Sequence, residues 1–226
     1  MLELRGVRKR FGTVQAVDGM DITVQEGAIF GLIGPNGSGK TTTMRMILHI
    51  LEPDEGSITW QGRPVRDVAA REFGYLPEER GLYPRMTVRD ELRFFAALHG
   101  VSGPQLEHEI DVWLERLMGD EAGKKVEDLS KGNSQKVQFL AAVLHRPSLL
   151  VLDEPFSGLD PVNVQMLKDA VLELQARGTT ILFSSHRMDH VQELCTHLCL
   201  IKKGRILLQG SREEVLASSG RRFLRL

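Results

Sequence analysis

The stretch GPNGSGKTT, residues 34–42, limits the possible folds of this chain more than any other feature. It matches the pattern G-x-x-x-x-G-K-[S/T] and lies between an apolar run at 28–33 and a helical pattern at 41–51. A strand, a glycine-rich loop and a helix in this order form a phosphate-binding loop, because backbone N–H groups and the positive end of the helix surround phosphate oxygens. We therefore expect an α/β domain that binds a nucleotide.

Each residue type in this phosphate loop suits that chemistry. Its glycines let the backbone turn N–H groups inward. Lys40 brings a positive charge to the β- and γ-phosphates, and Thr41 offers a hydroxyl to Mg²⁺, so ATP and Mg²⁺ are the expected cofactors. The residues expected to contact the nucleotide here are Gly34, Pro35, Asn36, Gly37, Ser38, Gly39, Lys40, Thr41 and Thr42.

A second apolar strand ends in carboxylates, as such a site requires. Residues 149–152 read LLVL and are followed by Asp153 and Glu154. Ligands of open α/β sheets bind at the carboxyl ends of the strands. We expect Asp153 to complete the Mg²⁺ shell and Glu154 to polarise the attacking water.

The order of strand and helix patterns predicts a parallel sheet covered by helices. Thr87 with Asp90 forms a capping box, and Asp160 with Pro161 forms a second helix start. The expected strands are 2–7, 20–24, 28–33, 74–76, 149–152, 179–184 and 197–201, and the expected helices lie at 41–51, within 87–117, and at 133–144, 161–176 and 188–194.

A helical block interrupts this alternation between about residues 78 and 146. We interpret the block as an inserted subdomain. The expected organisation is one domain, 1–226, with a core of 1–77 and 147–226 and a helical subdomain at about 78–146.

Composition restricts the partners and the location of the chain. The net charge of −1 provides no global basic field for nucleic acid. No apolar run approaches the ~20 residues that span a bilayer, and the first residues lack the apolar stretch of a signal peptide, so we expect a cytoplasmic location. Cys195 and Cys199 fit no recurrent zinc spacing, which favours buried, reduced thiols over a metal site.

Four further motifs accompany these two: GYLPEE at 74–79, LSKGN at 129–133, SGLD at 157–160 and His186. In this order, the six motifs resemble those of the ATP-binding subunits of ABC transporters, over nearly the whole chain. The segments LPEERGLYP, LSKGNSQKVQ, DEPFSGLDPVN and SSHRM are most similar to the ABC-2 type exporters, including the sodium-extrusion branch. The resemblance implies an α/β fold: a P-loop NTPase (RecA-like) core with an N-terminal antiparallel β-subdomain and an inserted α-helical subdomain.

The resemblance also implies further site residues. Phe11 stands where the family has an aromatic ring that stacks on adenine, and Val17 where a side chain contacts the base edge. Glu78 replaces the usual Gln that contacts Mg²⁺ and links the core to the helical subdomain, and this change adds negative charge. Asp160 matches the acid that couples two sites, and His186 matches the γ-phosphate sensor.

The LSKGN segment, which we call the signature segment, departs from the family's LSGGQ at Lys131 and Asn133. Ser130 can still donate its hydroxyl to phosphate, and Gly132 still lets the backbone approach closely. A helix expected from Asn133 would point its positive end the same way. We therefore expect Ser130, Gly132 and Asn133 to contact ATP.

For function, the resemblance implies an ATPase that powers export through a separate ABC-2 type membrane permease. It would form a head-to-tail dimer with an identical or different ATP-binding subunit on the cytoplasmic face of the membrane, without nucleic acid. Two alternatives remain: a soluble ABC ATPase acting on ribosomes or DNA, and a P-loop kinase, which would leave LSKGN, SGLD and His186 unexplained. The chain ends at Leu226, whereas members of the family often continue, which leaves open a longer protein.

Overall fold

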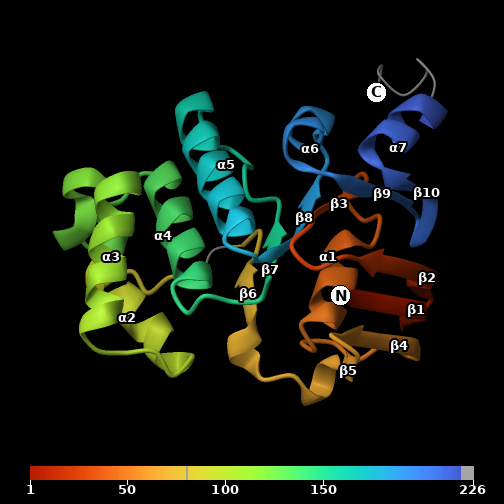
Figure 1. The fold of residues 1–226 in the computed structure, drawn as a ribbon, viewed down its shortest axis with the longest axis horizontal. Coiled ribbons are helices and arrows are strands. Elements are labelled where there is room, and N and C mark those ends of the chain that lie inside the picture. Colours follow the sequence, from red (N-terminus) through yellow and green to blue (C-terminus); the bar gives the residue numbers. More distant parts are fainter. Residues whose placement is uncertain (80, 220–226) are drawn as a thin grey trace. The chain divides into compact units, whose positions relative to one another are not determined.

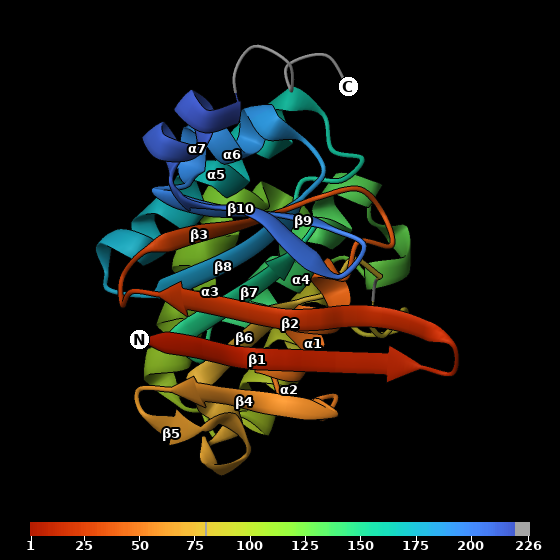
Figure 2. The ribbon, with the colours of Figure 1, turned by 90° about the vertical axis from the view of Figure 1, so that its right-hand side faces the viewer.

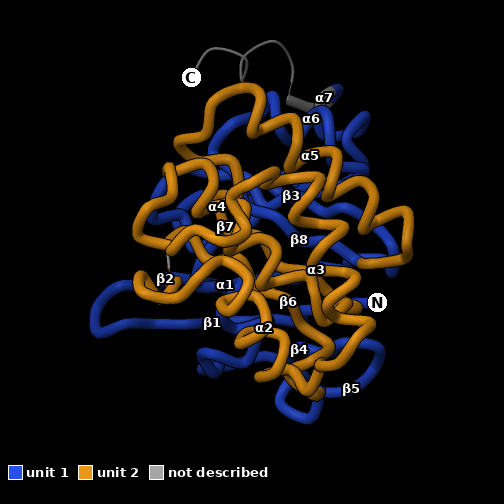
Figure 3. The backbone as a smooth tube through the Cα atoms, turned by 90° about the vertical axis from the view of Figure 1, so that its left-hand side faces the viewer, with its two compact units in different colours: residues 1–68, 180–226 blue, residues 69–179 orange. Residues whose placement is uncertain are grey.

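The computed structural model describes residues 1–79 and 81–219, and the chain's last segment with Leu226 lies outside these residues, as does Arg80 of LPEERGLYP. The chain divides into two compact units, which Figure 3 colours separately. Unit 1 comprises residues 1–68 and the part from 180 onwards, and unit 2 comprises residues 69–179. The narrower helical subdomain expected at 78–146 lies within unit 2, and its boundaries stay a prediction.

The N-terminal part of unit 1 forms the expected antiparallel sheet, with the strand order β2-β1-β4-β5 (Figure 2). The first two strands are longer than expected and form a hairpin, because cross-strand partners such as Arg8 and Asp18 place charged residues within the pairing. The short, polar strands β4 and β5 carry little periodicity and were not expected. The bounds are β1 Leu2–Phe11, β2 Val14–Val24, β4 Glu55–Trp60 and β5 Arg63–Pro64.

The second sheet segment of unit 1 has the order β10-β9-β3-β8. The strand β3 pairs in parallel with β8 and β9, and all residues of β3 and β8 are buried, which agrees with the apolar runs IFGLI in β3 and ILF in β8. The antiparallel edge strand β10, whose residues are all exposed or half-buried, and helix α7 were not expected. The bounds are β3 Ile29–Ile33, α1 Lys40–Ile47, β8 Thr180–Ser185, α6 Met188–Leu194, β9 His197–Lys202, β10 Arg205–Ser211 and α7 Arg212–Ser219.

Unit 2 combines two parallel strands with four α-helices (Figure 1). Thr87 caps α2 through the N–H of Asp90, as expected. The helical pattern within 87–117 forms two helices, since the chain turns at Gly100 and Gly103 with φ of 78° and 96°. The bounds are β6 Phe73–Leu76, α2 Val88–Leu98, α3 Pro104–Leu117, α4 Lys131–Val143, β7 Leu149–Asp153 and α5 Pro161–Ala176.

The core of unit 2 surrounds α4. Every residue of this helix from Ser134 to Val143 is buried, and the ring of Phe139 lies edge-on to Trp113 of α3. The burial of its body leaves only the N-terminal turn of α4 accessible. In the described part of the chain, no helix combines the length and the apolar character needed to cross a membrane.

Candidate functional site

The phosphate loop joins β3 to α1 within unit 1. The Lys40 ammonium is buried and donates to the carbonyl oxygen of Gly34 at 2.7 Å and to that of Pro35 at 3.3 Å. Its positive charge therefore lies inside the loop. Phosphate oxygens can take the place of these carbonyls as acceptors for the same ammonium.

The first turn of α1 has the features of an anion site. No side-chain hydrogen bond caps this helix at Gly39, so the positive end of the helix dipole faces the loop. Thr41 and Thr42 are half-buried in this turn, and the buried hydroxyl of Ser38 has no hydrogen-bond partner among the described residues. Gly39 has φ of 107°, and a side chain there would collide with the carbonyl oxygen of Ala16. The loop thus fits a bound phosphate and requires glycine at this point.

Two acids lie at the C-terminal end of the buried strand β7 in unit 2. Asp153 is its last residue, and only 1% of Asp153 and 6% of Glu154 is exposed. Glu154 has φ of 49°, a left-handed conformation that non-glycine residues rarely adopt. Its carbonyl accepts from the Ser157 N–H, and Gln135 donates to the neighbouring carbonyl of Pro155. Such backbone strain persists where the surroundings enforce it, and it concentrates at functional sites.

The signature segment forms the exposed start of α4. The helix begins at Lys131, two residues before the expected Asn133, because Ser130 is its N-cap and accepts from the Asn133 N–H at 3.1 Å. Ser130 uses its oxygen as an acceptor in this cap. Its O–H therefore still has the capacity to donate to a phosphate.

The SGLD motif packs directly beneath the signature segment within unit 2. Asp160 caps α5 through the N–H groups of Val162 and Asn163, and these hydrogen bonds, with the Asn163 amide, lower the pKa of its carboxyl group. A Cβ atom on Gly132 would lie 2.8 Å from the side-chain nitrogen of Asn163. Asn163 was not an expected site residue. Its position three residues after an N-cap Asp could have indicated a contact with Asp160.

The remaining expected residues of unit 1 lie on strands or directly after one. Ser185 is the register partner of Ile33, so His186 follows β8 at the same edge where the phosphate loop leaves β3. Phe11 ends β1, is 47% exposed and has the Lys9 ammonium 5.8 Å from its ring centre. Val17 is fully buried in β2 and offers no exposed surface to a base.

Two further expectations concern unit 2 and the cysteines. Glu78 is exposed, two residues beyond the end of β6.

Cys195 and Cys199 are free, buried thiols, as expected, and burial raises the pKa of both, that of Cys199 to about 12.

Comparison with known proteins places the chain in a family. The model of the ABC transporter family matches residues 17–157. An uncharacterized ABC transporter ATP-binding protein, YhaQ of Bacillus subtilis, is 55% identical over 98% of this chain and 75% of its own length. The Nod factor export ATP-binding protein I of Cupriavidus pinatubonensis is 36% identical over 96% of this chain and 68% of its own length.

Solved structures agree with these relatives. An ATP-binding subunit of an ABC transporter superposes with a TM-score of 0.89 at 29% identity, covering 97% of this chain and 93% of that one. The ADP conformation of MJ1267, an ATP-binding cassette of an ABC transporter, gives 0.86 at 26% identity, over 99% and 96% of the two chains.

The chain has the fold of the P-loop NTPases and belongs to the ABC transporter family. It is an ATP-binding and ATP-hydrolysing subunit of a membrane transporter. Neither the soluble ABC ATPase nor the kinase considered from sequence agrees with this family membership.

Proposed function

We propose that this subunit hydrolyses Mg²⁺-bound ATP in a head-to-tail dimer and powers export through a separate ABC-2 type membrane subunit, on the cytoplasmic face of the membrane. The observation that carries the proposal is the buried Lys40 ammonium inside a loop whose helix has no side-chain cap. Relatives supply the context: one is a Nod factor export protein, and one structural neighbour, cbiO1 from Clostridium perfringens, is part of the complex cbiONQ.

The residues fit a magnesium ion. Thr41, Asp153 and Glu78 carry the hard oxygen donors that Mg²⁺ prefers. Among the described residues, no three His, Cys, Asp or Glu side chains form a cluster, and Mg²⁺ in nucleotide sites needs only one or two carboxylates beside phosphates and waters. When bound, the ion neutralises charge on the β- and γ-phosphates.

The residues of the chain have separate roles in binding and hydrolysis. The α1 N-terminus and Lys40 hold the β- and γ-phosphates, while Glu154 orients and deprotonates the attacking water. His186, at the same sheet edge as the loop, contacts the γ-phosphate. Phe11, through its exposed ring, stacks on adenine.

The signature segment acts on the ATP of the second subunit. The Ser130 O–H and the backbone at Gly132 approach the γ-phosphate of the partner's nucleotide, and Asp160 couples the two sites through Asn163.

Two variants test this arrangement. Lys40→Ala removes the loop cation, and Gly132→Asp adds bulk and negative charge where the phosphate should approach.

Each variant homodimer has two damaged sites, so each should be inactive. In a mixed dimer, one site contains both substitutions and the other has a native Lys40 and a native Gly132. If the two sites act independently, mixing should restore up to about half of the native ATPase activity per mixed dimer. The double variant, Lys40→Ala with Gly132→Asp, is the control and should stay inactive on mixing with itself. Native turnover by Gly132→Asp alone would show that the signature segment is only a helix start.

A further inference from the structure

The turn between β9 and β10 is hydrogen-bonded to the phosphate loop. The N–H of Gly204 donates to the carbonyl oxygen of Ser38 at 2.9 Å. The carbonyl oxygen of Gly204 accepts from the N–H of Asp18 in β2, also at 2.9 Å. Gly204 therefore connects Ser38 of the phosphate loop to Asp18 of the earlier strand β2.

Only glycine fits at this junction. Gly204 has φ of 76°, and a Cβ atom there would lie 2.8 Å from the carbonyl oxygen of Ala16 and 3.2 Å from the Cα of Val17. The same carbonyl of Ala16 blocks a side chain at Gly39 of the loop, as described above. Three backbone segments thus pack directly on one another, so a shift in one must displace the others.

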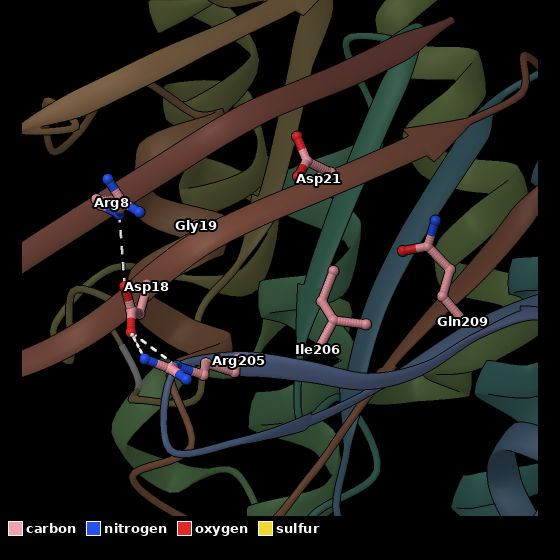
Figure 4. Close-up of a pocket in the computed structure, with 7 residues that line it drawn as sticks. All are labelled: Arg8, Asp18, Gly19, Asp21, Arg205, Ile206 and Gln209. Carbon is pink, nitrogen blue, oxygen red and sulfur yellow. Dashed lines mark hydrogen bonds and ion pairs between the residues drawn. The ribbon is translucent and has the colours of Figure 1, made fainter.

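An ion pair between Arg205 and Asp18 also connects this turn to β2. Arg205 donates through Nε to Asp18 at 2.7 Å, and its second nitrogen lies at the same distance from that carboxylate. Arg8 approaches Asp18 from the other side at 3.4 Å, and Figure 4 shows the carboxylate between the two guanidinium groups. The pKa of Asp18 is lowered, mainly by its hydrogen bond with Arg205.

This pair lies at the surface, with 72% of the Arg205 side chain and 23% of the Asp18 side chain accessible. An exposed pair contributes little to global stability. The two guanidinium nitrogens of Arg205 meet at one carboxylate oxygen of Asp18, and this contact restricts the direction in which the turn meets β2.

We propose that Gly204 is a positioning residue for nucleotide binding: it fixes Ser38 and Gly39 of the phosphate loop against β2, and the Arg205–Asp18 pair keeps it in place. The proposal rests on the role of the loop in ATP binding proposed above. Gly204 acts through Ser38, to which it is hydrogen-bonded. A misplacement of about 1 Å can cost ~100-fold in catalytic rate, and for a partial shift of a loop that binds phosphate we expect a loss of about tenfold in ATP affinity.

A matched pair of variants separates positioning from general backbone strain. Gly62, in the turn between β4 and β5 of the same unit, has φ of 75°, and a Cβ there would meet nothing within 4 Å. Gly62→Ala and Gly204→Ala therefore carry the same left-handed strain, but only Gly204→Ala pushes against β2. We would measure the Kd for Mg²⁺-ATP well below both melting temperatures, together with amide hydrogen exchange of the peptide spanning 34–43.

We expect Gly204→Ala to bind ATP about tenfold more weakly and to exchange faster across 34–43, while Gly62→Ala stays within about twofold of the native Kd. Equal affinities of the two variants, with equal loop exchange, would overturn the proposal. A Lys40→Ala arm tests the underlying function. If Lys40→Ala weakens ATP binding and Gly204→Ala does not, only the positioning role fails; native affinity of Lys40→Ala would refute the assigned loop itself.

If Gly204→Ala fails to fold, substitutions of the exposed residue Arg205 test the positioning role instead. Arg205→Gln should weaken ATP binding about two- to fivefold, a modest effect suited to a surface pair, and Arg205→Lys should restore it only in part, because one ammonium can pair with Asp18 but cannot replace two guanidinium nitrogens. Arg5→Gln is the control, since Arg5 is 73% exposed and pairs with Glu3 on β1. Equal affinity of Arg205→Gln and Arg5→Gln would overturn the proposal.

Discussion

Replacing Glu154 should separate the stability of this protein from its catalysis. Glu154 is 6% exposed and has φ of 49°, so the native backbone there is strained for any residue with a Cβ. A left-handed conformation costs an L-residue about 1–2 kcal/mol. Glycine removes that strain, but it adds about 0.5–1 kcal/mol of conformational entropy to the unfolded chain.

The difference predicts that Glu154→Gly is more stable by roughly 0.5–1 kcal/mol. For a domain of this size, about 1 kcal/mol shifts the melting temperature by roughly 2–4 °C, so we expect a rise of about 1–4 °C in thermal unfolding followed by circular dichroism. ATP hydrolysis should fall ~10²–10⁴-fold, because the general base is lost.

Two further variants make this test specific. Glu154→Gln keeps the side-chain shape and the strain, so it should hydrolyse ATP as slowly as Glu154→Gly while it melts lower than that variant and still binds ATP. Gln61→Gly relieves the same strain at φ of 51° in an exposed turn, so it should melt higher and keep native turnover. Native hydrolysis by Glu154→Gln would refute the role as base, and a lower melting temperature of Glu154→Gly beside a higher one for Gln61→Gly would refute the strain argument.

Three other outcomes are expected. Glu78→Gln should change the Mg²⁺ dependence of turnover without altering folding; identical Mg²⁺ titrations and turnover would make Glu78 a bystander. Burial lowers the pKa of His145 to about 4, so this imidazole binds a proton in the unfolded chain but not in the folded one between about pH 4 and 6.5. The urea midpoint should therefore fall as the pH drops from 6.5 towards 4, and less so in His145→Gln; an equal fall in both would assign the effect elsewhere. Cys195 and Cys199 should resist alkylation until the protein unfolds, and rapid labelling of the native protein would contradict their burial.

Much of the site could be predicted because its chemistry depends on local sequence. The phosphate loop needs a strand, closely spaced glycines, a lysine and a helix within about fifteen residues, and these constraints appear directly in the letters. Helix α5 was predicted with its observed bounds, since Asp160 and Pro161 mark its start without help from distant residues.

Elements without a strong period were missed. Strands β4, β5 and β10 carry mixed polar residues, and they exist because neighbouring strands supply their hydrogen-bond partners. The start of α4 was placed two residues late, because Ser130 can serve as N-cap or as loop residue, and only the folded backbone brings the Asn133 N–H to it.

The sequence by itself determined the phosphate loop and the acids at the end of β7, because each rests on residues close together in the chain, and it determined the family through six such local motifs in a fixed order. Only the tertiary structure decided that Val17 is buried, that Glu154 adopts a left-handed backbone and that Asn163 lies beneath Gly132. It alone brought Gly204 to Ser38, which lie more than 160 residues apart in the chain. Backbone hydrogen bonds of this kind leave no trace in side-chain patterns, since any residue has the same N–H and C=O groups and only the fold brings them together.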